Sequence, residues 1–186
     1  MMSEKKELQS VQETLLLPLW GRAIESKKNQ ALLVDKIAIR IIENINYDFT
    51  KIEKKVNKLS CASWISRSIY FDSKISDFLK KYPEGTVINI GCGLDTTYDR
   101  VNNGKATWYE LDFPEVINIR RQFIKESENR VFLPYSVFDK EWYGRIKNRK
   151  KVFIMLAGVI YYFDEKQVKE LLDDIIGVQN NHNSSS

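Results

Sequence analysis

The clearest chemical signal in this chain is a pair of glycines followed at a distance by an aspartate. Gly91 and Gly93 enclose Cys92 directly after the β-rich run Thr86–Ile90, and Asp112 stands at the end of the next β-rich run. Glycines after a strand let the chain turn sharply and present backbone N–H groups to a ligand. A carboxylate at the end of the following strand can accept hydrogen bonds from both hydroxyls of an adenosine ribose. The spacing therefore predicts a binding site for an adenosine-containing ligand.

The residues after the second glycine narrow the choice of ligand. A dinucleotide-binding loop has a third glycine to pack its helix under a pyrophosphate, and Thr96 stands at that position here. A phosphate-binding loop would need Gly-Lys-Ser or Gly-Lys-Thr, which this loop lacks. An adenosine ligand without a pyrophosphate fits better, and S-adenosylmethionine answers that description best. A nicotinamide-dependent oxidoreductase stays open as an alternative that Thr96 disfavours.

The histidine content excludes several other chemistries. The only histidine among the 186 residues is His182, in the polar C-terminal tail. A Ser-His-Asp triad, a Cys-His pair and a histidine-rich metal site are therefore not expected, and we predict no metal. Cys92 is expected to be a small buried residue of the loop rather than a nucleophile, because no base or cation is placed to lower its pKa.

The overall composition indicates a globular chain of an intracellular kind. Apolar residues make up 43% and charged residues 29%, and the two cysteines suit a reducing compartment. No stretch approaches the roughly 18 consecutive apolar residues of a membrane span, and no apolar signal core follows the charged N-terminus. The net charge of +4 is mild and spread along the chain. We therefore expect a cytoplasmic protein with no nucleic-acid and no membrane partner.

The candidate residues lie in the second of two regions with different patterning. Residues 1–81 carry apolar residues at helical spacing, which predicts an N-terminal helical cap. Residues 82–177 alternate β-rich runs with amphipathic runs, which predicts an α/β fold with a Rossmann-like, doubly wound parallel sheet. Cap and core are expected to form one structural domain, followed by a disordered polar tail over residues 178–186. The predicted strands are Thr86–Ile90, Ala106–Leu111, Arg130–Leu133 and Val152–Leu156.

Helix signals complete the predicted core. One helix is expected from about Asp95, after the glycine loop, and another from Pro114, whose fixed backbone angle suits a first helical position. A third should span residues 164–176, because Asp164 and Gln167 form a capping-box pair and Gly177 suits the position just past the last turn.

The fourth predicted strand has no strand after it. The chain turns polar after Gly177, so a right-handed sheet would leave the apolar strand Val152–Leu156 near an open edge. We therefore expect a sheet that is truncated after its fourth strand, and self-association of the chain through the exposed sheet edge.

Three segments carry a more specific signature. They are Val87–Thr97, in which Gly-Leu-Asp-Thr extends the glycine pair, Trp108–Val116 and Phe153–Phe163. They resemble the leucine carboxyl methyltransferase family of class I S-adenosylmethionine-dependent methyltransferases, and look closest to its bacterial polyketide-type O-methyltransferase branch. With Thr14–Glu25 and Ser66–Leu79 the resemblance covers nearly all of residues 14–176.

The resemblance implies S-adenosylmethionine as the cofactor and assigns residues to it. Arg67 matches the family arginine that pairs with the methionine carboxylate, for which a planar guanidinium is well suited. Arg22 is a weaker match to a second basic contact near that carboxylate. Gly91 and Gly93 would line the methionine and the ribose, and Asp112 would hold the ribose hydroxyls.

Further positions match or depart from the family pattern after the third strand. Asp139 matches the acid that reads the adenine amino group, and Phe138 would pack near the ring. Ala157 stands where many relatives carry a glutamate, so one acidic contact to the cofactor is missing or comes from elsewhere. Relatives also continue through further strands of the sheet. No residue is assigned a catalytic role.

Structural explanations of several residues stay open beside these roles. Asp112 could cap the helix that begins near Pro114, with or without binding ribose. Asp139 could be an exposed loop acid, and Arg67 a surface residue whose stem covers apolar neighbours.

The resemblance implies methyl transfer to a carboxylate or hydroxyl oxygen of an acceptor, either a small molecule or a protein terminus. The cofactor sulfonium already carries a good leaving group, so an acceptor carboxylate needs only in-line positioning. That chemistry suits a chain without a usable histidine base. The alternative is a catalytically inactive, truncated remnant that retains only part of the cofactor-binding half.

Overall fold

The computed structural model describes residues 6–7, 13–147, 149 and 151–180, with side chains for 13–147, 149 and 151–176. The chain forms two compact units, of which the first contains Met1–Ser73 with Leu94–Val101 and the second Lys74–Gly93 with Asn102–Ser186. The segment after the glycine loop thus belongs with the N-terminal helices. The prediction of a cap over residues 1–81 and a core over 82–177 stays a prediction. His182 lies outside the described residues.

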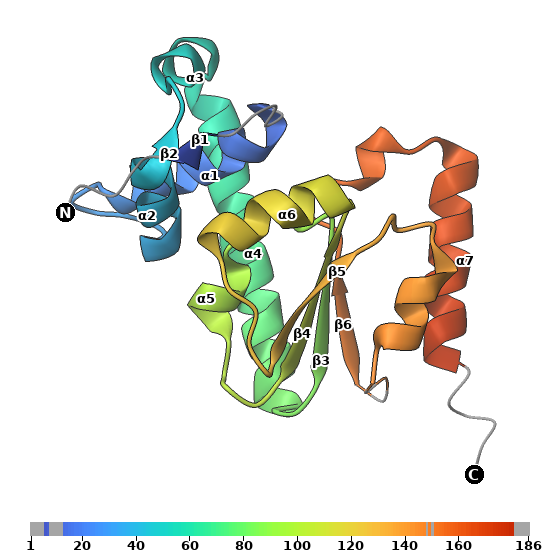
Figure 1. Cartoon of the computed structure of the whole chain (residues 1–186). Helices are drawn as coiled ribbons and strands as arrows, with labels where there is room; N and C mark the ends of the chain where they lie inside the picture. The colour runs from blue at the N-terminus through green and yellow to red at the C-terminus, as the bar shows by residue number, and fades with distance from the viewer. Residues whose placement is uncertain (1–5, 8–12, 148, 150, 181–186) are drawn as a thin grey trace. The chain divides into compact units, whose positions relative to one another are not determined.

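The second unit is built on a parallel sheet in the order β5-β4-β3-β6 (Figure 1). This order, third-second-first-fourth along the chain, is that of the first four strands of a Rossmann sheet. The predicted Rossmann-like α/β fold is confirmed, and each strand ends within one residue of its predicted bounds. The strands are β3 (Thr86–Ile90), β4 (Thr107–Asp112), β5 (Arg130–Pro134) and β6 (Val152–Met155).

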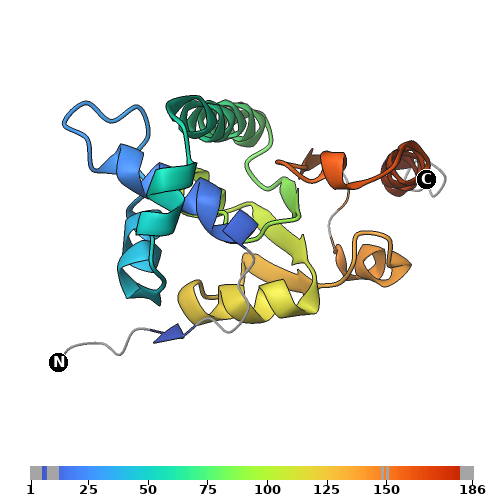
Figure 2. The same ribbon diagram turned by 90° about the horizontal axis from the view of Figure 1, so that it is seen from above.

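Helices cover both faces of this sheet, as near-continuously apolar strands require. One face carries Ile88 and Tyr109, which pack with Trp142 and with Leu171 of helix α7 (Glu165–Asn180). The 3₁₀ helix η1 (Lys140–Arg145) lies beside α7 in both views (Figures 1 and 2). Because side chains alternate along a strand, residues 108, 110 and 112 face the other way. Helix α6 (Pro114–Phe123) packs there.

Helix α7 confirms one predicted signal and corrects another. Asp164 and Gln167 form the predicted capping box, since each accepts the other's backbone N–H, at 2.8 and 3.0 Å. The helix does not end before Gly177 but continues to Asn180, so the predicted stop there is wrong. A helical glycine costs only about 1 kcal/mol relative to alanine, and Gln179 is a good helix former. Residues 178–180 are therefore helical, while the rest of the predicted disordered tail lies outside the described residues.

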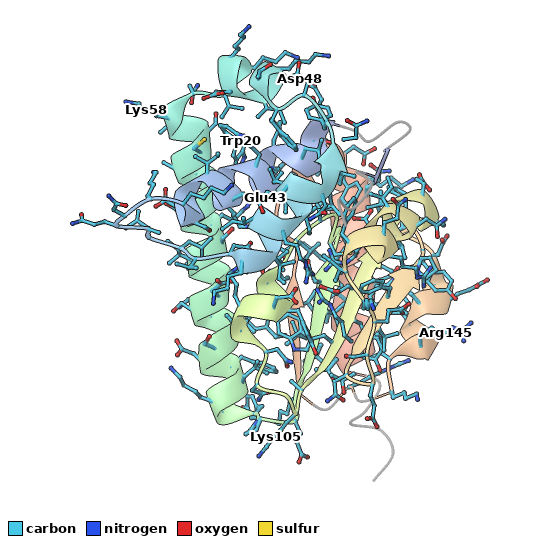
Figure 3. All side chains as sticks on the ribbon, turned by 60° about the vertical axis from the view of Figure 1, so that its left-hand side comes forward. Trp20, Glu43, Asp48, Lys58, Lys105 and Arg145 are labelled. Carbon is cyan, nitrogen blue, oxygen red and sulfur yellow. The ribbon has the colours of Figure 1, made fainter. Side chains whose placement is uncertain are left out.

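The first unit is mainly helical, as predicted. Helices α1 (Glu13–Ser26) and α2 (Lys36–Asn44) lie side by side, with Trp20 on the first and Glu43 on the second (Figure 3). The short pair β1 (Lys6–Glu7) and β2 (Ile45–Asn46) was not predicted. The remaining helices are α3 (Thr50–Lys55), the first part of α4 (Lys58–Lys81) and α5 (Thr97–Val101).

Helix α4 continues from the first unit into the second. Its last turns pack on the sheet, where the ring centroid of Phe78 lies 5.6 Å from that of Phe153 on β6. Helix α5 has five residues and begins at Thr97, later than the predicted start near Asp95. Within the described residues, none of the helices combines the length and the apolarity needed to cross a membrane.

Candidate functional site

The glycine loop sits at the carboxyl end of β3, where ligands bind in open α/β sheets. The backbone N–H groups of Gly91 and Cys92 both donate to the carbonyl of Leu111 on β4, at 2.8 and 3.1 Å. Gly91 and Gly93 have φ angles of +66° and +45°, which residues with a side chain rarely adopt. The sequence prediction of a sharp turn built on these two glycines is confirmed, and Cys92 is buried in it, as predicted.

The space beside Gly91 is filled by Val159, a residue of the segment after β6, so a side chain does not fit at this position. A Cβ atom at this position would lie 2.2 Å from Cγ2 of Val159. The loops that follow β3 and β6 therefore touch. The strand order of the sheet reverses between these two strands. Open α/β sheets bind their ligands at this switch point. The absence of a side chain at Gly91 therefore serves packing here, whatever else it serves.

Asp112 is the last residue of β4 and turns its carboxylate toward the glycine loop. Its Oδ2 accepts the N–H of Gly93 at 2.7 Å, and its Oδ1 accepts the N–H of Phe113 at 2.8 Å. Burial raises the pKa of Asp112, although these two N–H groups and the charge of Arg120 act in the opposite direction. The helix-capping interpretation is wrong, because α6 begins after Phe113 without a side-chain cap.

Beneath the loop lies a buried ion cluster that the sequence interpretation did not identify. Glu110, two residues before Asp112 on β4, is fully buried and binds two arginines. Arg120 of α6 donates to it at 2.5 and 3.3 Å, and Arg130 of β5 at 2.8 and 3.3 Å. Arg120 also donates through Nη1 to the carbonyl of Gly93 at 2.8 Å. Two features of the sequence could have indicated this cluster. Glu110 is a charged residue within a β-rich run, and Arg120 lies three residues after Ile117, on the same face of the helix.

Asp139 and Phe138 lie in the turn after β5. Asp139 is exposed, and its Oδ2 accepts the backbone N–H of Ser136 at 3.0 Å. The ring of Phe138 packs edge-on against that of Phe163, with 5.0 Å between their centroids. Asp139 thus supports its own turn in this structure, and a bond to adenine stays a prediction.

In the first unit, a second buried network is centred on Asp35. Its Oδ2 accepts hydrogen bonds from Arg22 Nε and Arg100 Nη1, both at 2.9 Å, and from the hydroxyl of Thr96. Arg22 Nη2 also donates to the carbonyl of Leu94 at 3.2 Å. Thr96, which stands where a dinucleotide loop has its third glycine, therefore uses its side chain to fasten the segment after the loop.

The network extends through Arg100 to two more carboxylates. Arg100 forms a two-pronged pair with Asp72 of α4 at 2.7 and 2.9 Å. Burial acts to raise the pKa of Asp95, but the charges of Arg22 and Arg100 and the hydrogen bonds from Thr97 together outweigh it, and the net pKa is lowered. The pKa of Asp72 is raised, because burial outweighs the pairing with Arg100. The carboxylates of this unit thus fix the segment that follows Gly93.

A comparison with known protein families decides the identity of the fold. Residues 16–176 match the model of the family described as leucine carboxyl methyltransferase. The chain belongs to this family. The resemblance predicted from the three sequence segments is thereby confirmed.

Individual relatives are distant. The Streptomyces glaucescens protein "Tetracenomycin polyketide synthesis O-methyltransferase TcmP" is 26% identical over 176 residues, which are 94% of this chain and 64% of that protein. The Gibberella zeae protein "S-adenosyl-L-methionine-dependent methyltransferase dpfgK" is 25% identical over 183 residues, covering 90% of this chain and 61% of that protein. A solved structure of the plantazolicin methyltransferase BpumL covers 92% of this chain and 58% of its own, with a TM-score of 0.44 and 14% identity. The chain spans less than two thirds of the length of these curated relatives.

The two arginines that the family resemblance assigns to the cofactor have different surroundings here. Arg22 is 4% exposed and donates to the carboxylate of Asp35 and to the carbonyl of Leu94. Arg67 on α4 is half-buried, and among the described residues no group hydrogen-bonds or ion-pairs with its guanidinium. Arg67 is therefore available to an anionic ligand, whereas Arg22 has a structural partner. Both assignments stay predictions.

Proposed function

We propose that this member of the leucine carboxyl methyltransferase family binds S-adenosylmethionine and transfers its methyl group to an oxygen atom of an acceptor. The supporting observation is the pair formed by Asp112 and Gly93 at the carboxyl ends of β4 and β3. Membership of the family and the printed functions of TcmP and dpfgK agree with it.

The residues present fit the adenosine part of such a cofactor. Each carboxylate oxygen of Asp112 accepts one backbone N–H and keeps a further lone pair, so both ribose hydroxyls could be bound at once. The carboxylate is half-buried, so hydrogen bonds to it are less weakened by water than at an exposed site. Asp139 and Phe138 are proposed for the adenine ring, and the backbone of Gly91 and Gly93 for the methionine and ribose.

We propose Arg67 for the methionine carboxylate. The half-buried guanidinium has no hydrogen-bond or ion-pair partner among the described residues, so it can pair with the opposite charge of a ligand. A guanidinium also binds a carboxylate with two parallel hydrogen bonds, which gives orientation as well as affinity. For Arg22 we propose an indirect role, because the carboxylate of Asp35 already satisfies it.

The chemistry requires little of the protein beyond binding and orientation. The cofactor, when bound, supplies an activated methyl group on a sulfonium whose leaving group is a neutral thioether. The residues of this chain would hold the adenosine and amino-acid ends, so that the acceptor oxygen meets the methyl group in line. A carboxylate acceptor is already ionised at neutral pH and needs no base. A hydroxyl acceptor would need one.

Both cysteines, Cys61 and Cys92, are free thiols. Free thiols persist where glutathione and thioredoxin keep cysteines reduced. We propose a cytoplasmic location on this ground. As the acceptor we propose a small molecule that carries a carboxylate or hydroxyl group.

The proposal is tested by calorimetric titration of the chain with S-adenosylhomocysteine and with 5′-methylthioadenosine, which lacks the amino-acid end. We expect both to bind, and Arg67→Ala to weaken S-adenosylhomocysteine by about tenfold, the loss of one charge-assisted pair. The affinity for 5′-methylthioadenosine should stay the same, because it has no carboxylate.

Lys58→Ala, at an exposed position of the same helix, is the matched control and should change neither affinity. If neither S-adenosylhomocysteine nor 5′-methylthioadenosine binds, the cofactor assignment is refuted. Equal losses for both nucleosides in Arg67→Ala would refute the role of Arg67. Methyl transfer is tested with isotope-labelled cofactor against carboxylate and phenol libraries, and binding without any turnover would contradict it.

A further inference from the structure

Both backbone polar groups of Gly93, its N–H and its carbonyl, form hydrogen bonds with charged side chains. Its N–H donates to Oδ2 of Asp112 at 2.7 Å, and its carbonyl accepts from Nη1 of Arg120 at 2.8 Å. Arg120 is fully buried on α6, although arginine is among the residues that are rarely buried unless they are paired. Glycine has broad conformational freedom, and these two charged partners restrict Gly93 to one backbone state at φ +45°.

Arg120 can hold the loop because it is itself held. Glu110 accepts from Nη2 and Nε of Arg120, at 2.5 and 3.3 Å, which leaves Nη1 directed to Gly93. The guanidinium carbon also lies 5.1 Å from the ring centroid of Phe132 on β5. Only arginine has a planar fork that can serve a carboxylate and a carbonyl from fixed directions at once.

We propose that Arg120 is a positioning residue for the cofactor: it fixes the carbonyl of Gly93 so that the glycine loop and Asp112 keep their binding geometry. This inference rests on the proposed function. The role of Arg120 explains why a buried ion cluster lies under the loop. Burying charges gives little net stability even when they are paired, so a cluster in contact with a ligand loop is better explained by orientation.

The charge of Arg120 supports the same role. Asp112 must be ionised to accept two hydrogen bonds from ribose hydroxyls, and its burial favours the neutral form. Arg120 opposes this effect by lowering the pKa of Asp112. One side chain therefore orients the loop and favours the ionised form of its acidic partner.

The structure offers a matched control in Arg130. It is also buried and binds the same carboxylate of Glu110 at 2.8 Å, but from β5. Arg120→Lys and Arg130→Lys should lower the stability of the full-length chain by similar amounts, because both disturb the same cluster. Only Arg120→Lys should weaken the binding of S-adenosylhomocysteine, by about tenfold in calorimetry. The affinity of Arg130→Lys should stay within about threefold of that of the original chain.

A second readout reports on Gly93 without any ligand. The chain has eight glycines, so ¹⁵N-glycine labelling gives a simple amide spectrum in which Gly93 can be assigned. The Gly93 resonance should move in Arg120→Lys and stay in place in Arg130→Lys. Arg120→Gln removes the positive charge beside Asp112, so in this variant the pH at which affinity is lost should rise.

Equal affinities or equal Gly93 shifts in the two lysine variants would overturn the proposal. If the original chain does not bind the nucleoside, the proposed function fails, and the Gly93 resonance still decides whether Arg120 holds the loop. Glu110→Gln is the second variant, should Arg120→Lys not fold, since it keeps both guanidinium groups. It should shift Gly93 and weaken binding together, and a loss of affinity with Gly93 unmoved would contradict the role of Arg120.

Discussion

The side chain of Asp112 accepts the backbone N–H of Gly93 across a distance of 2.7 Å. This bond joins the ends of β4 and β3, which are adjacent and parallel, and so ties the acid to the turn that it faces. It uses one lone pair of one carboxylate oxygen, and the carboxylate stays half-buried. The residue is therefore both a brace for the loop and an acceptor with free capacity.

Asp112→Ala should weaken S-adenosylhomocysteine binding by at least about tenfold. The substitution removes two charge-assisted hydrogen bonds to the ribose, each worth about 1.5–3 kcal/mol, and also the brace on Gly93. Calorimetry measures the affinity, and circular dichroism establishes that the variant is folded. Glu128→Gln, at an exposed acid between α6 and β5, is the control and should bind as the original chain does. An unchanged affinity in folded Asp112→Ala would remove Asp112 from the site.

The raised pKa of Asp112 predicts opposite effects of pH on stability and on binding. Burial raises the pKa of Asp112 in the folded chain, so folding takes up a proton as the pH falls through that value. The stability from this proton is complete below the unfolded pKa of about 3.9 and is lost as the pH rises through the folded pKa. The free energy of unfolding, relative to Asp112→Asn, should therefore increase on acidification.

Binding should change the other way. Protonated Asp112 is a poorer acceptor, so affinity for S-adenosylhomocysteine should fall on acidification, starting above the pH at which an ordinary aspartate titrates. Urea unfolding and calorimetry over the same pH series measure the two quantities. A pH-independent difference in stability between the original chain and Asp112→Asn would show that the pKa is not raised.

Gly91→Ala should destabilise the chain by about 3 kcal/mol. A side chain at φ +66° costs about 1–2 kcal/mol, and the new Cβ would meet Val159 at 2.2 Å, where overpacking adds about 1–3 kcal/mol. Gly104→Ala separates the two costs, because its φ is +75° and a Cβ there meets nothing within 4 Å. In urea unfolding, Gly104→Ala should show only the smaller loss.

Val159→Ala should recover part of the loss when it is combined with Gly91→Ala. The coupling energy in this double-mutant cycle measures the contact between the loops after β3 and β6. Additive effects of the two substitutions would contradict the packing explanation.

Much of this architecture could be predicted because its signals are local. The strand bounds follow from short apolar runs that end in turn residues, as in Thr86–Ile90, and the capping box of α7 depends on Asp164 and Gln167 alone. The turn at Gly91 and Gly93 and the position of Asp112 follow from the order of strands and loops in a parallel sheet. Each of these needs only neighbours in the chain or a general rule of topology.

The parts that could not be predicted depend on partners distant in the sequence. Nothing local indicates that Asp35 gathers Arg22, Thr96 and Arg100, or that Arg120 reaches back to Gly93. The helix stop at Gly177 was wrong for a related reason, because a glycine signals an end only where the chain after it cannot continue as helix. Buried ion networks carry no periodic pattern, and only the fold brings their members together.

The strand β6 gives the last prediction. It lies at one end of the sheet order, and among the described residues no strand pairs with its outer side. Its residues Val152–Met155 are all apolar, without the lysine or proline that protects natural edges. We expect concentration-dependent self-association of the chain at micromolar concentrations, through pairing at this edge, in static light scattering.

Phe153→Lys should reduce this association, because a charge at the edge opposes pairing with another strand. The ring of Phe153 also packs against that of Phe78, so circular dichroism must first establish that this variant is folded. Tyr161→Lys is its control: it adds the same charge at a 70% exposed aromatic residue outside the strand and should leave the association as it is. Amide exchange measured at two concentrations adds a test without mutation, since the outward N–H groups of β6 should gain protection as the chain associates. A chain that stays monomeric throughout this concentration range, with β6 amides exchanging at one rate, would show that the edge does not pair.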